Sequence, residues 1–208
     1  TRREDLLPAW LAIYGAGRHH PLVAREMPAA DRPLLQACHQ ADEGIYTIDA
    51  FVHRTGEIVG LACIKLLQRP RGTGPGLCFE EAPLDADLLA GLDRLCRAVG
   101  FHGIIDAEFV VDGGRRLLID VNPRIYNHMA FELDRGLPLA WMAYLGAIGD
   151  EGALAEQMAA AAALAPVASR RIYVHRVSLL LLLALQAAVG GMRREERRRW
   201  WRCSRASA

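Results

Sequence analysis

The most constraining feature of the sequence is an apolar segment that acidic residues interrupt at regular intervals. It reads IIDAEFVVDGGRRLLIDVNPR and runs from Ile104 to Arg124. Its β-branched residues and its Asp-Gly-Gly turn signal predict a β-hairpin, with one strand over 104–111 and the other over 117–121. The chain must therefore place several carboxylates on two neighbouring strands.

The length of the turn decides which acids face one another. A three-residue loop over 113–115 pairs Glu108 with Asp120 and Asp106 with Asn122. Residues two apart on a strand share a face, so all four side chains then project together. A two-residue turn shifts the pairing by one residue and puts Glu108 on the face away from Asp120. We expect the three-residue loop.

Opposed carboxylates destabilise a hairpin unless a cation lies between them. Mg²⁺ binds oxygen ligands, of which the protein supplies a few and water or phosphate supplies the rest. Pro123 keeps Asn122 extended and ends the strand, and Arg124 follows with a guanidinium suited to phosphate. An exposed hairpin with solvated acids is the alternative, but the ordered set favours a metal site.

This segment resembles the signature of the ATP-grasp family, a Glu on one strand followed by an acid, Asn, Pro and Arg on the next. Here Glu108 is followed twelve residues later by Asp120, and Asn122, Pro123 and Arg124 complete the pattern. The resemblance implies that Glu108, Asp120 and Asn122 bind Mg²⁺, or alternatively Mn²⁺, on the phosphates of ATP. It implies a catalytic phosphate contact for Arg124.

Two details qualify this resemblance. The family often has Glu where this chain has Asp120, which is shorter but keeps the charge. Asp106 is not a usual ligand in the family, so we expect it to support the ligands rather than to bind the metal.

Further nucleotide contacts are implied by resemblance or by charge. The segment from Pro21 to Met27 resembles the hinge strand of ATP-grasp proteins, which implies that Glu26 and Met27 lie near adenine and ribose; a plain strand is the alternative. Lys65 interrupts an apolar strand, and a buried Lys is costly unless it is paired. It is expected to face a phosphate or a carboxylate, as in related ligases, or to reach solvent with its ammonium group.

The pattern along the chain predicts an α+β fold: the larger lobe of ATP-grasp proteins, an antiparallel sheet with flanking helices, plus a C-terminal helical appendage. Alternating strands are expected over 45–52 and 57–67, and an amphipathic helix over 85–99, capped by Asp85 and ended by Gly100. The expected regions are the remainder of an ATP-binding lobe with the hinge strand (1–40), the ATP-grasp core lobe with the acidic hairpin (41–150) and the appendage (151–208).

Two stretches and one histidine remain open. The loop 69–76 is basic and rich in Gly and Pro, typical of either a surface loop or a flap over triphosphate. The apolar run 177–189 is shorter than the roughly 20 residues that a membrane span needs, so we expect a buried or amphipathic helix. The basic run 193–205 is expected to belong to the appendage rather than to contact nucleic acid or a membrane. His128 is expected to pack or hydrogen-bond rather than to contact substrate.

Composition excludes some classes of function. The formal net charge of +1 gives no case for a nucleic-acid partner. Five dispersed cysteines without a CxxC spacing indicate reduced thiols and a cytoplasmic location.

The resemblance to ATP-grasp proteins implies an ATP-dependent ligase that joins a small-molecule carboxylate to an amine through an acyl phosphate. The sequence does not indicate an oligomeric state.

Parts of the ATP-grasp pattern have no counterpart in this sequence. ATP-grasp enzymes usually begin with a pre-grasp domain and a small lobe that carries phosphate-binding lysines. We therefore expect either the C-terminal part of a longer ligase or a truncated, non-catalytic module that binds a nucleotide or a partner. A membrane-anchored protein is a third class.

Overall fold

The computed structural model describes residues 4, 8, 11, 44–68, 76–112, 114–164, 171–181 and 198. The chain divides into two units, Thr1–Cys38 and His39–Ala208, and the elements below belong to the second. The predicted hinge strand, with Glu26 and Met27, lies outside the described residues. So do residues 69–75 of the basic loop and all of the basic run 193–205 except Arg198.

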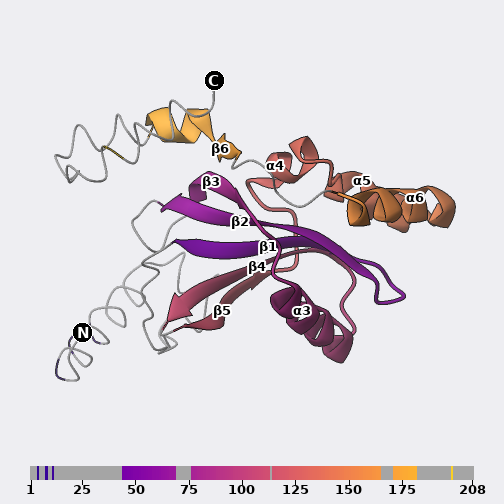
Figure 1. Cartoon of the computed structure of the whole chain (residues 1–208), viewed down its shortest axis with the longest axis horizontal. Helices are drawn as coiled ribbons and strands as arrows, with labels where there is room; N and C mark the ends of the chain where they lie inside the picture. Colours follow the sequence, from indigo (N-terminus) through magenta and orange to yellow (C-terminus); the bar gives the residue numbers. More distant parts are fainter. Residues whose placement is uncertain are drawn as a thin grey trace. The chain divides into compact units, whose positions relative to one another are not determined.

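The core of the second unit is a six-stranded sheet with the order β5-β4-β1-β2-β3-β6 (Figure 1). Every neighbouring pair of strands is antiparallel. The strands are β1 (Ile45–Val52), β2 (Ile58–Gln68), β3 (Gly76–Ala82), β4 (Gly103–Asp112), β5 (Arg115–Asn122) and β6 (Ile172–Val174). Together with the helices, this sheet confirms the α+β fold predicted for the larger ATP-grasp lobe.

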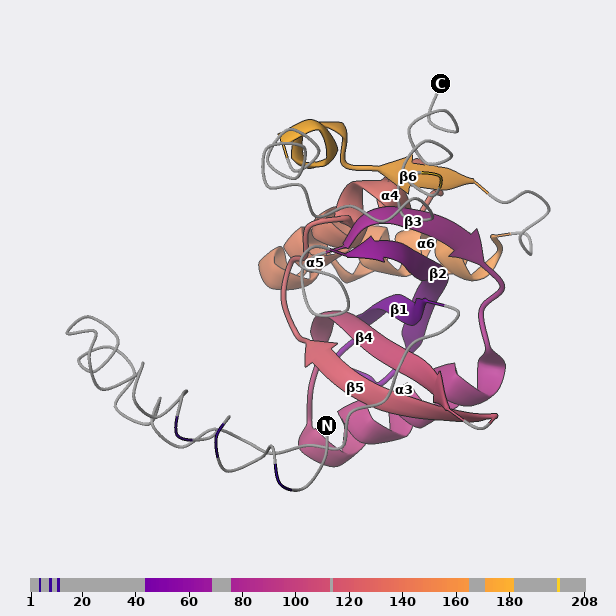
Figure 2. The ribbon, with the colours of Figure 1, turned by 90° about the vertical axis from the view of Figure 1, so that its left-hand side faces the viewer.

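Helices cover both faces of the sheet. The helices are α3 (Ala86–Val99), α4 (Met129–Asp134), α5 (Leu139–Ile148) and α6 (Glu151–Ala162). Helix α3 lies against one face, and α5 and α6 lie against the other (Figures 1 and 2). Residues 176–181 are also helical, but most of the predicted C-terminal appendage beyond them lies outside the described residues. Within the described ranges, no helix has both the length and the apolar character to cross a membrane.

Helix α3 forms where its caps and its apolar stripe predict it. The side chain of Asp85 accepts hydrogen bonds from the backbone N–H groups of Asp87 and Leu88, which would otherwise lack partners at the helix start. Gly100 ends the helix with a φ of 66°, a left-handed conformation that glycine adopts without strain. Leu92 and Cys96 are buried against the sheet, as the helical spacing predicts.

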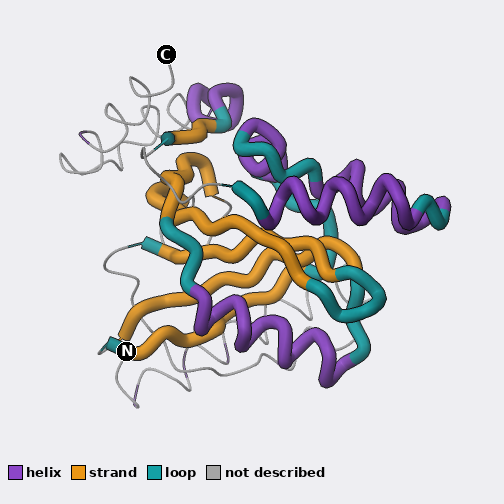
Figure 3. Tube along the Cα trace, turned by 45° about the vertical axis from the view of Figure 1, so that its right-hand side comes forward, coloured by secondary structure: helices purple, strands orange, loops and turns teal. Residues whose placement is uncertain are grey.

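The two faces of the sheet differ in polarity, and this difference positions the candidate site. The face under α3 is apolar and includes Ile48, Ala50 and Ala107. The opposite face is apolar at one end, where Phe51 and Ile104 pack with α5 and α6. Toward the other ends of β1 and β4 that face becomes polar, because the residues that alternate with the apolar ones are charged. Figure 3 shows that α5 and α6 cover only part of this second face.

The β4–β5 hairpin has the predicted pairing at its acidic residues but a different turn. Asp112 pairs with Arg115, so the predicted three-residue loop is wrong and the connection is two residues long. A β-bulge then inserts Ile119 between two consecutive pairs, and beyond it Glu108 pairs with Asp120. The bulge offsets the one-residue shift that the shorter turn would cause. The acids therefore face one another for a reason that the sequence did not reveal.

Strand β3 was not predicted. It reads GLCFEEA and combines an apolar half with two consecutive glutamates, so it lacks a clear alternation. It forms because β2 and β6 pair with it from both sides. Tertiary pairing therefore decides the structure of this segment.

Asp85 offers a test of the fold away from the candidate site. We expect Asp85→Ala to lower the free energy of unfolding by about 1 kcal/mol, because two helical N–H groups lose their acceptor. Asp85 also forms an ion pair with Arg116. The matched variant Asp85→Asn removes the charge but keeps a capping oxygen, so it should cost less. Urea unfolding followed by circular dichroism measures both, and an equal loss in the two variants would contradict the capping role.

Candidate functional site

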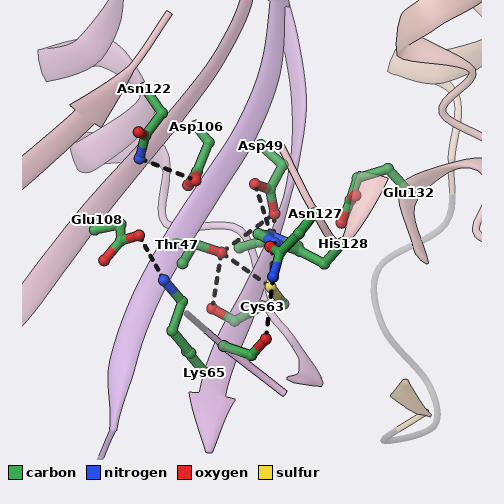
Figure 4. Close-up of polar contacts among 12 residues, drawn as sticks. Thr47, Asp49, Cys63, Lys65, Asp106, Glu108, Asn122, Asn127, His128 and Glu132 are labelled. Atoms are coloured by element: carbon green, nitrogen blue, oxygen red, sulfur yellow. Dashed lines mark hydrogen bonds and ion pairs between the residues drawn. The ribbon is translucent and has the colours of Figure 1, made fainter. Parts of the chain in front are cut away.

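The predicted metal ligands lie together on one face of the β4–β5 hairpin. Asp106 pairs with Asn122, and Glu108 pairs with Asp120. The amide Nδ2 of Asn122 donates to Oδ2 of Asp120 at 3.1 Å and to Oδ2 of Asp106 at 3.4 Å. Asn122 therefore links the two aspartates, and Figure 4 shows its side chain pointing toward Asp106. Asp120 is exposed at the sheet edge, whereas Asp106 is buried.

Lys65 has a carboxylate partner on this face. Its Nζ donates to Oε1 of Glu108 at 2.5 Å, and both side chains are largely buried. Lys65 comes from β2 and Glu108 from β4, so the ion pair crosses over β1, which lies between them (Figure 4). The prediction that Lys65 faces a carboxylate or a phosphate is thus confirmed for the carboxylate. Its contact with phosphate stays a prediction.

Arg124 lies at the end of the hairpin, next to the predicted ligands. Its NH2 donates to Oδ1 of Asn122 at 2.7 Å, and its NH1 donates to the backbone carbonyl of Ile125 at 3.1 Å. The side chain is exposed. Two hydrogen bonds orient the guanidinium beside the acidic face, where it can still reach an anion from solvent.

A second group of polar side chains lies deeper on the same face. Asp49 is in the centre: Thr47 donates from Oγ1 to its Oδ2 at 3.2 Å, and the Cys63 thiol donates to the same oxygen at 3.5 Å. Nε2 of His128 lies 3.3 Å from Oδ1 of Asp49. Asp49 also pairs with Asp106 across β1 and β4, so this group adjoins the hairpin acids (Figure 4).

Glu132 of helix α4 and Arg135, the residue after this helix, form an ion pair in the buried group. NH2 of Arg135, the residue that follows α4, donates to Oε1 of Glu132 at 3.0 Å, and its NH1 donates to the carbonyl of Ala62 on β2 at 2.8 Å. Glu132 is fully buried, and its Oε2 has no hydrogen-bond partner among the described residues. Arg135 therefore anchors α4 to the sheet while half of the Glu132 carboxylate stays unsatisfied.

This chain is similar to parts of several solved structures of carboxylases and of an amidolyase. The biotin carboxylase domain of a thermophilic 2-oxoglutarate carboxylase shares 15% identity over 78% of this chain and 33% of its own, with a TM-score of 0.47. Pyruvate carboxylase from Rhizobium etli shares 21% identity over 48% of this chain and 9% of its own, with a TM-score of 0.41. The phosphoribosylaminoimidazole carboxylase ATPase subunit from Aquifex aeolicus shares 17% identity over 46% of this chain and 30% of its own, with a TM-score of 0.39.

The chain spans a third or less of the length of each of these proteins. No family model matches the sequence. No curated protein matches it either. The antiparallel sheet and its flanking helices are those predicted for the larger ATP-grasp lobe.

The sequence identified the hairpin part of this polar face and missed its buried part. Glu108, Asp120, Asn122 and Arg124 lie together as predicted, and Lys65 joins them. The residues missed are those of the buried group: Thr47, Asp49, Cys63, Glu132 and Arg135. A lone acid in an apolar strand, as in the stretch IYTIDAFV, was the available signal. His128 is stacked on Phe79 with ring centroids 4.0 Å apart, in agreement with the expected packing role.

Burial shifts the titration of this group. Burial raises the pKa of Asp49 to about 6, although Arg135 and the hydrogen bonds from Thr47 and Cys63 act against it. Burial and then the charge of Asp49 raise the pKa of Glu132 to about 8 and that of Asp106 to about 7. Burial lowers the pKa of His128 below its usual value, which favours the neutral imidazole. The buried carboxyls of this face therefore keep their protons to a higher pH than the same carboxyls do in the unfolded chain.

These shifts predict a pH dependence of stability. A carboxyl whose pKa is higher in the folded than in the unfolded chain stabilises the fold below its unfolded pKa, near 4, and loses that contribution as the pH rises through its folded pKa. The free energy of unfolding, measured with urea in the presence of a chelator, should therefore fall between about pH 5 and pH 8.

The variant Glu132→Gln should flatten the upper part of that pH profile, because it removes the group with the pKa of about 8. Glu156→Gln, at an exposed position on α6, is the matched control and should leave the slope unchanged. Stability that rises with pH over this range would contradict the buried protonated carboxyls.

The Lys65–Glu108 ion pair makes a second prediction. Lys65→Met should lower the free energy of unfolding by about 3 kcal/mol, because it leaves a largely buried carboxylate unpaired. In the double variant Lys65→Met/Glu108→Gln the loss should be clearly smaller than the sum of the two single losses. A double-mutant cycle by urea unfolding measures this coupling. Additive losses would show that the two side chains do not interact in solution.

Proposed function

We propose that the acidic face of the β4–β5 hairpin binds Mg²⁺ and ATP, and that this lobe is part of an ATP-dependent carboxylate–amine ligase. The observation that carries the proposal is the bulged register of the hairpin. It places Glu108 opposite Asp120 and Asp106 opposite Asn122 on one face. A hairpin that served only as structure would gain stability from opposite charges or apolar pairs at these positions.

The side chains present fit a hard divalent cation. They offer only oxygen atoms, in the carboxylates of Glu108 and Asp120 and the amide of Asn122, which is the ligand type that Mg²⁺ prefers. Asp120 is exposed and Glu108 is largely buried, so the proposed ligands extend from the solvent-exposed edge of the sheet toward its interior. Oδ1 of Asp106 is buried without a hydrogen-bond partner among the described residues, so it is an oxygen next to the ligands that a nearby cation could satisfy. When bound, Mg²⁺ would supply positive charge to the phosphates of ATP.

Two cations of the chain complement these ligands. Arg124 is held on Oδ1 of Asn122, next to the place where phosphate oxygens would gather. Its fork of N–H groups suits a phosphate or an acyl phosphate, and its fixed charge would stabilise a phosphoryl group in transfer. Lys65 lies against Glu108 and supplies positive charge from the floor of the face. The roles of Glu26 and Met27 near adenine remain predictions.

The proposed reaction needs no nucleophile from the protein. A carboxylate oxygen of the substrate attacks the γ-phosphorus of ATP, so that ADP leaves and an acyl phosphate forms. The nitrogen of the amine then attacks the acyl carbon, and phosphate leaves with formation of the amide and release of a proton. Binding, orientation and charge stabilisation are the tasks left to Glu108, Asp120, Asn122, Arg124 and Lys65.

The test is the thermal unfolding of the chain with ATP, with and without Mg²⁺. At ATP about 100-fold above its dissociation constant, binding should raise the unfolding temperature by about 5–10 °C in the presence of Mg²⁺. The shift should be much smaller without Mg²⁺ or in Asp120→Asn, which keeps the shape of the side chain and removes its charge. Glu156→Gln removes an acid far along the chain on α6 and should retain the full shift.

Two results would contradict the proposal. The first is a folded chain whose unfolding temperature does not respond to Mg²⁺ with ATP. The second is a shift that Asp120→Asn leaves intact, which would place the nucleotide elsewhere. A shift without ADP release in the presence of carboxylates and amines would instead indicate the non-catalytic nucleotide-binding module.

A further inference from the structure

The buried part of the polar face brings four different metal-binding side chains together. Asp49 lies on β1 and Cys63 on β2. His128 immediately precedes α4, and Glu132 lies on that helix. One potential ligand atom of each lies within 4.8 Å of those of the other three. The exposed fractions of these residues are 0%, 0%, 1% and 0% in the same order. Figure 4 shows Glu132 extending toward His128 and Asp49.

One atom of this cluster lacks the partner that a buried polar atom needs. Oε2 of Glu132 has no hydrogen-bond partner among the described residues, although Glu132 is fully buried. An unpaired buried carboxylate oxygen is costly, and either a proton shared with Asp49 or a bound cation can satisfy it. The hydrogen bond from Arg135 satisfies only the other oxygen of the same carboxylate.

The histidine directs Nε2 of its ring into the cluster. Asn127 donates from Nδ2 to the carbonyl of Gly76 at 3.1 Å, so its Oδ1 is the atom that faces His128. Nδ1 of His128 lies 3.2 Å from this oxygen and must donate to it. Nε2 is then the unprotonated nitrogen of the neutral ring, and it faces Oδ1 of Asp49 at 3.3 Å. Two electron-pair donors therefore face each other, and either a proton or a cation must lie between them.

Neighbouring groups also orient the ligands as in protein metal sites. A histidine ligand usually donates its other ring N–H to an oxygen, which fixes the ring. Here Asn127 accepts that hydrogen bond. Oγ1 of Thr47 lies 2.9 Å from Sγ of Cys63, and its single hydroxyl proton would turn from Asp49 to Cys63 when Cys63 is a thiolate. Arg135 holds Glu132 and adds a positive charge beside it.

We propose that Asp49, Cys63, His128 and Glu132 bind a divalent transition-metal ion of the Zn²⁺ class in a closed tetrahedral site. Ligand atoms at the usual distances of about 2.0–2.3 Å from Zn²⁺ lie roughly 3.3–3.8 Å apart. Cys63 Sγ lies 3.5 Å from Oδ2 of Asp49, and His128 Nε2 lies 3.3 Å from Oδ1 of Asp49. Each oxygen of Asp49 therefore already meets this range with one neighbouring ligand. The widest separation in the cluster requires a contraction of about 1 Å.

The ligand chemistry separates this site from the proposed Mg²⁺ site on the hairpin. A thiolate and an imidazole favour Zn²⁺, Co²⁺ or Fe²⁺, whereas the hairpin offers only oxygen atoms. One thiolate and two carboxylates exceed the charge of a divalent ion by one, and Arg135 offsets that excess. Four protein ligands leave no position for substrate, so the ion would hold β1, β2 and α4 together rather than catalyse a reaction.

The test measures the number of metal ions bound per chain in the complete folded protein. The chain is produced in cells supplied with Zn²⁺, purified, and measured by native mass spectrometry and by elemental analysis. The expected content is about one Zn²⁺ per chain, retained in excess Mg²⁺. Chain produced with Co²⁺ should show a thiolate-to-cobalt charge-transfer band and the intense visible bands of a tetrahedral ion.

Matched variants locate the ion. Cys63→Ser should abolish the charge-transfer band, and His128→Gln should lower the metal content. Cys96→Ser, which changes a buried cysteine of α3 under the opposite face, should change neither. Asp120→Asn should also leave the band intact, which distinguishes this site from the hairpin. Circular dichroism shows which variants are folded.

The outcome for the unmodified chain decides the proposal even where a variant fails to fold. Folded chain that holds no stoichiometric Zn²⁺ or Co²⁺ after growth with either ion would overturn it, and the cluster would then be a proton-sharing network. A bound ion whose charge-transfer band survives Cys63→Ser would also overturn it. Neither result bears on ATP binding, because the hairpin is tested with Mg²⁺ and ATP alone.

Discussion

Several carboxylates lie close together on one face of the sheet, and the structure of this lobe depends on how their negative charge is balanced. Asp49, Asp106, Glu108 and Asp120 follow one another across neighbouring strands, and Glu132 approaches them from α4. Lys65 neutralises one of the acids and Arg135 another. Burial raises the pKa values of Asp49 and Asp106, so these two carboxyls keep their protons to a higher pH than they would in the unfolded chain. An apolar sheet of the same shape would need none of these contacts.

Solvent divides this face into two parts with different chemistry. At the hairpin edge Asp120 and Arg124 are exposed, so ions and phosphates can reach them from water. In the centre, Asp49, Cys63, His128 and Glu132 are sealed by Phe79, α4 and the sheet. Exposed carboxylates suit a reversible Mg²⁺–phosphate contact. A buried thiol, imidazole and carboxylate pair suit a permanent partner, either shared protons or a transition-metal ion.

The two parts are linked through the backbone pairing of β1 with β4. Asp49 and Asp106 are directly paired, and Asn122 connects Asp106 to the edge. A change of charge in the buried group therefore acts on Asp106 first, because the charge of Asp49 contributes to its raised pKa. The charge of the buried group and the pKa of Asp106 are therefore linked.

Several parts of this structure followed from local sequence alone. Helix α3 was predictable because Asp85 and Gly100 mark its ends and its apolar residues follow the helical period. Strand β1 was predictable over its full length, since Ile45–Val52 is apolar or β-branched at every position except Asp49. Strand β3 was not, because its two glutamates break the alternation and its partners lie in distant segments. A local sequence pattern thus predicts an element when the signal for that element lies within its own residues.

The sequence by itself determined which residue types line the hairpin: the order of acid, Asn, Pro and Arg after a Glu twelve residues earlier predicted its metal-binding candidates. Only the tertiary structure decided how they meet, because the turn is two residues long and the bulge at Ile119 restores the pairing. It also decided that Asp49, Cys63, His128 and Glu132 converge. These residues are spread over more than 80 positions of the sequence, and no local pattern relates them. Strand pairing and the packing of α4 bring them together, and both depend on contacts between distant parts of the chain.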